Sequence, residues 1–263
     1  MAGFDHSALG DQDCAITWQT WKRRIIPSGK RLVFKSTIFC CPSHLQHGLA
    51  ELESTFTSGE NIWPWQSKLI DRPSFEDGLY NDYRVVHFHL GTYFEPSGYI
   101  NRTRELLFAV VDSTSVYEIG IYRHGDWYEF DILDIINENW PKLLDNVTMN
   151  GLDIAPCIRT REEVKAIREA NIIPIIKLKN GRIVAPLGGG VATDGTSFES
   201  VRSADFWAKV LRTGEKAIIA DIREQIRNRY MESRDYEVLL DATNNEIAGV
   251  LDGTHKWILW KKT

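Results

Sequence analysis

The chain of 263 residues is 43% hydrophobic and 25% charged, a composition typical of a globular protein with one large or two smaller domains. Its net charge of −5 argues against a protein that coats nucleic acid through bulk positive charge. No stretch approaches the roughly 18–20 apolar residues of a membrane span, and the N-terminal residues lack the basic and apolar regions of a signal peptide. These features predict a cytoplasmic protein.

The cysteines do not follow a disulfide or zinc-binding pattern. Cys40 and Cys41 are adjacent, Cys14 and Cys157 lie far from them, and no Cys-x-x-Cys spacing occurs. We therefore expect buried, reduced thiols.

In chain order, the first dozen residues are small, polar and acidic, and they are expected to be loosely ordered. A strand is predicted over 31–40. A helix then begins near Pro42 and ends at Gly59, a residue that commonly follows the last helical turn. Its apolar residues recur at helical spacing and are Leu45, Leu49, Leu52 and Phe56.

The clearest pattern lies between residues 83 and 140. Strands are predicted over 83–90, 105–111 and 115–122, and the last two are joined by a link of hairpin length. A helix follows and must end near Trp140, because the next residue is a proline. This segment predicts an antiparallel sheet flanked by helices.

Beyond Asn150 the pattern changes. The sequence predicts a helix over 160–170, a hairpin around Asn180-Gly181, a long helix over 198–232 and a closing meander of strands. Residues 1–150 hold 13 Lys and Arg against 20 Asp and Glu, whereas residues 151–263 hold 18 against 16. We therefore predict an α+β protein with two domains: 1–150 forms the antiparallel-sheet domain, and 151–263 forms a smaller α+β domain for recognition or regulation.

Three histidines mark the candidate site. The alternation in Val85-Val86-His87-Phe88-His89-Leu90 indicates a strand that places His87 and His89 on one face. His124 follows the third predicted strand. A simple meander would bring the end of the first strand, the start of the second and the end of the third to one rim of the sheet. The side chains expected at this rim are His89, Arg102, Arg104, Tyr122 and His124.

These side chains suit RNA cleavage through the substrate's own 2′-hydroxyl group. Such chemistry needs a base, an acid and cations that stabilise the phosphorane, and it requires no metal or cofactor. Histidine can serve both proton roles near neutral pH. We predict that His89 and His124 form the proton-transfer pair and that His87 supports its neighbour. Arg102 and Arg104 are predicted to hold the phosphate, with Tyr122 as a further substrate contact.

Two other interpretations remain open. The His-x-His pair with His124 is an acceptable zinc triad, to which Asp82 or Asp126 could add an oxygen ligand, although the nearby guanidinium groups disfavour a cation. Alternatively, the histidines are structural, and the chain is a non-enzymatic binding module such as an immunity or adaptor protein. A spatial test separates these classes, because an enzyme must open its histidines and arginines onto one cleft.

The segment 83–140 resembles the RelE/YoeB-type RNase toxins and their wider barnase-like class. The resemblance rests on the strand meander, on Arg102 and Arg104 at the central strand, and on His124 after a strand. It implies a hydrolase of the endoribonuclease class that binds RNA, with RNA or the ribosome and a neutralising protein as partners. The sequence departs from the family in being long and acidic, and His-Phe-His-Leu is not the family's motif.

Overall fold

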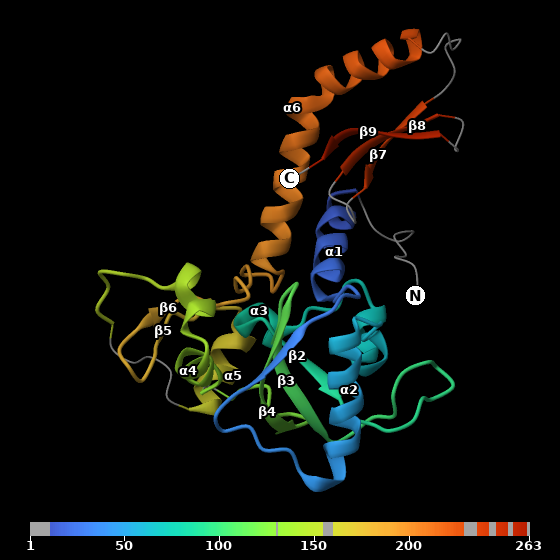
Figure 1. The fold of residues 1–263 in the computed structure, drawn as a ribbon. Helices are drawn as coiled ribbons and strands as arrows, with labels where there is room; N and C mark the ends of the chain where they lie inside the picture. Colours follow the sequence, from blue (N-terminus) through green and yellow to red (C-terminus); the bar gives the residue numbers. More distant parts are fainter. Residues whose placement is uncertain are drawn as a thin grey trace. The chain divides into compact units, whose positions relative to one another are not determined.

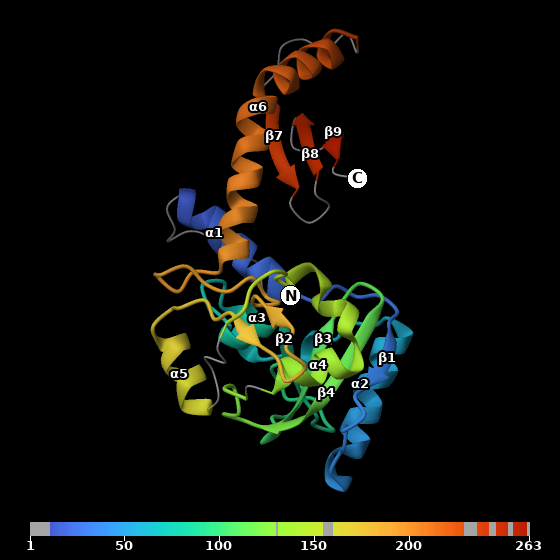
Figure 2. The same cartoon turned by 90° about the vertical axis from the view of Figure 1, so that its left-hand side faces the viewer.

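A computed structural model describes residues 11–129, 131–154, 160–228, 236–241, 246–251 and 255–261 (Figures 1 and 2). The chain divides into two compact units, Met1–Ala204 and Asp205–Thr263. Each unit is described by itself below. No helix in the described part of the chain has both the length and the apolar character needed to cross a membrane.

The first unit contains a four-stranded sheet with helices on both faces. Its longer helices are α1 (Asp11–Arg24), α2 (Gln46–Ser58), α3 (Gly78–Tyr83), α4 (Ile132–Asn139) and α5 (Arg161–Glu169). Short 3₁₀ helices cover Ser43–Leu45, Trp63–Trp65, Lys68–Asp71 and Pro141–Val147. The strands are β1 (Leu32–Lys35), β2 (Val85–His89), β3 (Glu105–Val111) and β4 (Ser115–Arg123), and a small hairpin pairs β5 (Ile176–Lys177) with β6 (Ile183–Val184).

The predicted meander is confirmed, and so is the α+β class. The strand order is β1-β4-β3-β2, and β2, β3 and β4 pair antiparallel in sequence. The sheet is nevertheless mixed rather than purely antiparallel, because β1 pairs with β4 in parallel. Register places His89 opposite Leu106 and Leu106 opposite Tyr122. Because residues directly opposite each other share a face, these three side chains lie on one side of the sheet.

Each face of the sheet has its own hydrophobic core. On one face, α2 supplies Leu49, Leu52 and Phe56, which pack with Phe88 and Val86 of β2 (Figure 1). The other face is covered by α4 and by the β5–β6 hairpin. His87 and His89 belong to this second face, because they alternate with Val86 and Phe88 along the strand.

The core on the α4 face continues past Asn150. It includes Ile176, Leu178 and Val184, and Thr148 forms a β-bridge with Val184. The compact units divide between Ala204 and Asp205 instead. The boundary therefore differs from the one predicted near Asn150: residues 151–204 do not begin a second domain, because their apolar side chains complete the core of the first unit.

The N-terminal helix was not anticipated from the sequence. Residues 1–10 lie outside the described residues, but Asp11, which falls in the segment expected to be loosely ordered, already begins α1. Trp21 is buried, and its indole N–H donates to the carbonyl of Ile70 at 2.8 Å. This contact anchors α1 on the segment that precedes α3.

The second unit contains most of α6 (Phe198–Asn228) and a three-stranded antiparallel sheet. Its strands are β7 (Tyr236–Asp241), β8 (Glu246–Leu251) and β9 (His255–Lys261), in the order β7-β8-β9. The predicted long helix and closing meander are thus confirmed.

The cysteines differ in part from expectation. Cys14, Cys40 and Cys41 carry free thiols, but Cys40 is exposed and the other two are half-buried. Cys157 lies outside the described residues.

Candidate functional site

A cavity of about 260 Å³ opens beside β2 in the first unit. It is formed by the start of the 3₁₀ helix Lys68–Asp71, the start of α3, the strand β2, the segment after β4 and the helix α5. Its lining residues are Ser67, Leu69, Phe75, Asp77, Gly78, Leu79, His87, His124, Trp127, Tyr128 and Arg168. Two of the three predicted histidines therefore meet at one cavity.

His87 reaches the cavity from the middle of the edge strand β2, where it pairs with Phe108 of β3. Burial lowers the pKa of its imidazole, and the charges of Arg102 and His124 act in the same direction, whereas the carboxylate of Asp77 opposes them. Its Nδ1 is buried without a hydrogen-bond partner in the described part of the structure. His87 is therefore held in its neutral form.

His124 enters the same cavity from the turn after β4. Its backbone N–H donates to the carbonyl of Arg104 at 2.7 Å, which extends the β3–β4 pairing to this residue. Its side chain is exposed. Trp127 contacts both imidazoles, with ring centroids 4.9 Å from His87 and 5.0 Å from His124. The two imidazoles thus lie at most roughly 10 Å apart, since each is about 5 Å from the same indole.

His89 does not line the cavity and is only 1% exposed. Its Nδ1 accepts the backbone N–H of Thr103 at 3.1 Å, which places the imidazole proton on Nε2. Burial lowers the pKa of His89 to about 3, helped by the positive charge of Arg102. The structure thus differs from the expectation that His89 stands at the rim, because its ring is buried and binds the backbone of Thr103.

The predicted phosphate-binding residues are not brought into the cavity either. The guanidinium of Arg102 donates to the carbonyl of Gln66 at 3.0 Å, and partial burial lowers its pKa. Arg104 is exposed, and its described contact with the site is the backbone bond to His124. Tyr122 stacks on Phe108 at 4.5 Å, and burial raises the pKa of its phenol. The expected rim geometry is not formed, because Arg102 and Tyr122 make local contacts of their own and Arg104 is exposed.

Arg168 is a cavity residue that sequence reasoning missed. It comes from α5, whose first turn carries a capping box: the side chain of Thr160 accepts from the Glu163 N–H, and the side chain of Glu163 accepts from the Thr160 N–H. Its Nε donates to Asp82 at 2.6 Å, and its Nη1 donates to the carbonyl of Trp127 at 2.6 Å. The pattern of charges in the helix gave no sign that this arginine turns inward.

A second contact from α5 holds the segment that carries His124. Arg161 forms ion pairs with Asp126 at 2.9 Å and with Glu129 at 3.1 Å. Asp126 also accepts the backbone N–H of Arg123 at 3.0 Å, which closes the turn after β4. Arg161 and Arg168, at the two ends of α5, therefore both bind residues within 126–129.

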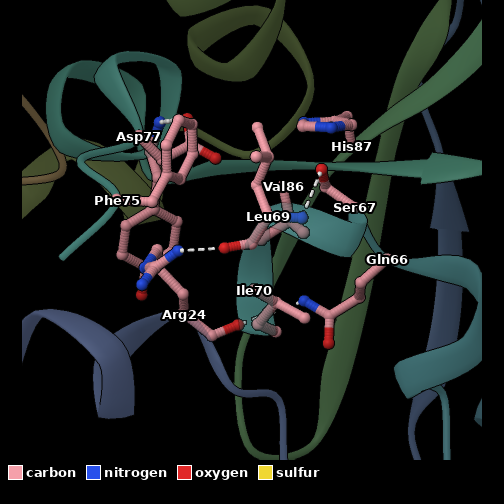
Figure 3. Close-up of a pocket in the computed structure, with 10 residues that line it drawn as sticks. Arg24, Gln66, Ser67, Leu69, Ile70, Phe75, Asp77, Val86 and His87 are labelled. Carbon is pink, nitrogen blue, oxygen red and sulfur yellow. Dashed lines mark hydrogen bonds between the residues drawn. The ribbon is translucent and has the colours of Figure 1, made fainter. Parts of the chain in front are cut away.

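A small cavity of about 20 Å³ lies behind His87 and shares several walls with the larger one. Figure 3 shows Arg24 below it, donating to the carbonyl of Leu69, while Gln66 donates to the carbonyl of Arg24. Arg24 also donates to Arg72 and Pro73 carbonyls. This buried guanidinium holds the segment 69–73, in which Leu69 lines both cavities. His87 lies on the opposite side of the small cavity (Figure 3).

Among the described residues, no group of three or more His, Cys, Asp or Glu side chains is arranged to hold a metal ion. Comparison of the chain with known protein families, curated proteins and solved structures produced no match.

Proposed function

We propose that the chain is a cytoplasmic, metal-independent endoribonuclease whose proton-transfer pair is His87 and His124. The observation that carries this proposal is the contact of both imidazoles with Trp127 in the wall of one cavity. His87 takes the catalytic position that the sequence suggested for His89. His89 becomes a structural residue at the end of β2.

The proposed reaction is transesterification within the RNA. His87 removes the proton of the 2′-hydroxyl, and the 2′-oxygen attacks the adjacent phosphorus. The bond from phosphorus to the 5′-oxygen breaks, and His124 donates a proton to that leaving oxygen. The products are a 2′,3′-cyclic phosphate and a free 5′-hydroxyl, so all atoms and protons balance without a co-reactant.

The environments of the two histidines support this division of roles. Burial lowers the pKa of His87, so that its neutral, proton-accepting form predominates at neutral pH. His124 is exposed, so its imidazole is in contact with solvent. The aromatic rings of Phe75, Trp127 and Tyr128 give the cavity a surface suited to a nucleobase.

The first test is incubation of the purified full-length chain with end-labelled RNA in the presence of EDTA. His87→Ala and His124→Ala should each lower the cleavage rate by roughly 10²- to 10⁴-fold, as expected for loss of a general base or acid. His47→Ala is the matched control, because His47 is an exposed histidine on α2 that pairs with Glu51 in its own helix. This control should cleave at the wild-type rate.

The pH profile adds an independent check on His87. The acidic limb of kcat/KM should lie below pH 6.5, because the base remains deprotonated there. Cleavage that EDTA abolishes would instead favour a histidine-ligated metal hydrolase. If no RNA is cleaved with or without divalent ions, the chain is a binding module of the immunity or adaptor kind.

The resemblance to RNase toxins extends this proposal to partners. Because the chain is acidic overall, recognition of RNA or the ribosome must depend on local contacts rather than on bulk charge. A neutralising protein is the partner that a toxin would require. Co-purification with a small protein encoded beside it is the observation that would support this part.

A further inference from the structure

We propose that Arg168, on α5, binds a phosphate oxygen of the ligand in this cavity. The inference rests on the proposed function, in which that ligand is a nucleotide of RNA. It assigns the phosphate contact to a residue outside the segment 83–140, and it replaces Arg102 and Arg104 in that role.

Arg168 is fixed before any ligand arrives. Its Nε and Nη1 are committed to Asp82 and to the carbonyl of Trp127, both at 2.6 Å. Its guanidinium also lies over the rings of Tyr83, at 5.6 Å, and Tyr128, at 5.2 Å. Such a guanidinium loses little side-chain freedom when it binds an anion.

One donor group of this guanidinium is left over. Nη2 of Arg168 is buried and has no hydrogen-bond partner among the described residues. A buried donor of a charged group without an acceptor is unfavourable, and such a group is commonly found where a ligand binds. Arg168 lines the cavity with His87 and His124. A phosphate oxygen that enters the cavity and displaces the side chains covering Nη2 would supply the missing acceptor.

The charges around the cavity define the ligand. Asp82 already balances much of the charge of Arg168, and Asp77 adds a carboxylate to the lining, although one of its oxygens caps α3 by accepting from Tyr80. The site is therefore not a strong general anion trap. It fits a phosphate that is carried on an aromatic base, because the aromatic lining contributes the remaining contact.

Arg161 provides a matched control on the same helix. Like Arg168 it is an arginine of α5 that binds the segment after β4, through Asp126 and Glu129. It does not line the cavity. A change at Arg161 therefore tests the binding of residues 126–129 without removing the proposed phosphate contact.

The experiment is calorimetric titration of the full-length protein with the four nucleoside 3′-monophosphates, each compared with its own nucleoside. The wild type should bind at least one nucleotide roughly 10- to 100-fold more tightly than the matching nucleoside, as expected for a hydrogen bond to a charged group. Arg168→Ala should abolish this preference. Arg168→Lys should lower it several-fold, because the single ammonium group of lysine cannot bind Asp82, the Trp127 carbonyl and a phosphate in the planar arrangement of a guanidinium. Arg161→Ala should keep the preference.

Removing Arg168 leaves Asp82 buried and unpaired, so thermal melts accompany each titration. The double variant Asp82→Asn with Arg168→Met removes both partners and should fold while lacking the preference. If neither Arg168→Ala nor the double variant folds, Arg168→Lys is the variant that tests the phosphate contact. A folded variant that keeps the wild-type preference overturns the inference, as does a wild type that binds every nucleoside and its nucleotide equally.

RNA cleavage and nucleotide binding are measured in separate assays. Failure of the nuclease proposal can therefore be distinguished from failure of the phosphate-binding role of Arg168. A phosphate preference that depends on Arg168 in a protein that cleaves no RNA upholds this inference and refutes the nuclease. Cleavage that depends on His87 and His124, with a phosphate preference unaffected by Arg168→Lys, upholds the nuclease and refutes the role of Arg168.

Discussion

Glu118 should make the first unit less stable as the pH rises. This residue lies on β4, opposite Lys35 of β1, and is 0% exposed. Neither of its carboxyl oxygens has a hydrogen-bond partner among the described residues, because Lys35 forms its ion pair with Glu53 at 2.8 Å. Burial, reinforced by the charge of Glu53, raises the pKa of Glu118 to about 8. At neutral pH the folded chain therefore keeps this carboxyl protonated.

The magnitude follows from proton linkage. The unfolded chain ionises this group near pH 4.5, whereas the folded chain holds its proton up to pH 8. Between these values the free energy of unfolding falls by about 1.4 kcal/mol per pH unit. The stability contributed by the raised pKa is thus fully present below pH 4.5. The loss is on the order of 3 kcal/mol at pH 7 and of 5 kcal/mol above pH 9.

Glu118→Gln removes the ionisation and keeps the shape of the side chain. Urea denaturation, monitored by tryptophan fluorescence, should give equal midpoints for the variant and the wild type near pH 4.5. At pH 7 the variant's midpoint should be higher by roughly 1–3 M, given typical urea dependences. Glu138→Gln, an exposed change on α4, is the control and should follow the wild type. Parallel pH profiles for Glu118→Gln and wild type would refute the buried, protonated carboxyl.

Two further predictions separate structural from functional residues. His89→Ala should lower the free energy of unfolding by roughly 1–3 kcal/mol, as measured by urea denaturation, because it leaves the buried N–H of Thr103 without its acceptor. A catalytic loss equal to that of His87→Ala, at unchanged stability, would contradict the structural role of His89. A fragment of residues 1–150 should not melt cooperatively, because it lacks Ile176, Leu178 and Val184 of the core and leaves Asp82 without Arg168; a sharp calorimetric transition for this fragment would argue against the shared core.

Sequence patterns predicted those helices and strands well whose formation depends on residues close together in the chain. The alternation in β2, the apolar run of β3 and the hairpin link to β4 each depend on neighbouring residues, and all three strands form as expected. The strand expected over 31–40 shortens to Leu32–Lys35, and its parallel pairing with β4 could not be foreseen. Parallel pairing joins segments far apart in sequence, and no turn motif records it.

The candidate site was predicted less completely, for a related reason. The period of two along β2 placed His87 and His89 on one face, but it could not say which imidazole reaches a cavity and which is covered. That depends on Thr103, whose backbone N–H binds His89, and on Trp127, whose ring contacts His87. Trp127 stands three residues after His124, so its position in the sequence was a usable sign of an aromatic wall.

The contribution of α5 is the part that sequence patterns could not supply. A change of charge and pattern near Asn150 suggested a separate domain, yet Arg168 reaches back to Asp82 and Trp127, and Arg161 reaches back to Asp126 and Glu129. Local composition does not record which buried carboxylate an arginine will pair with, because the pairing is decided by the packing of the whole unit. Within the segment 151–263, which was expected to form a domain for recognition or regulation, the helix α5 instead lines the cavity through Arg168. A movement of α5 would therefore act on Asp126, Trp127 and Glu129, which follow His124 closely in the chain.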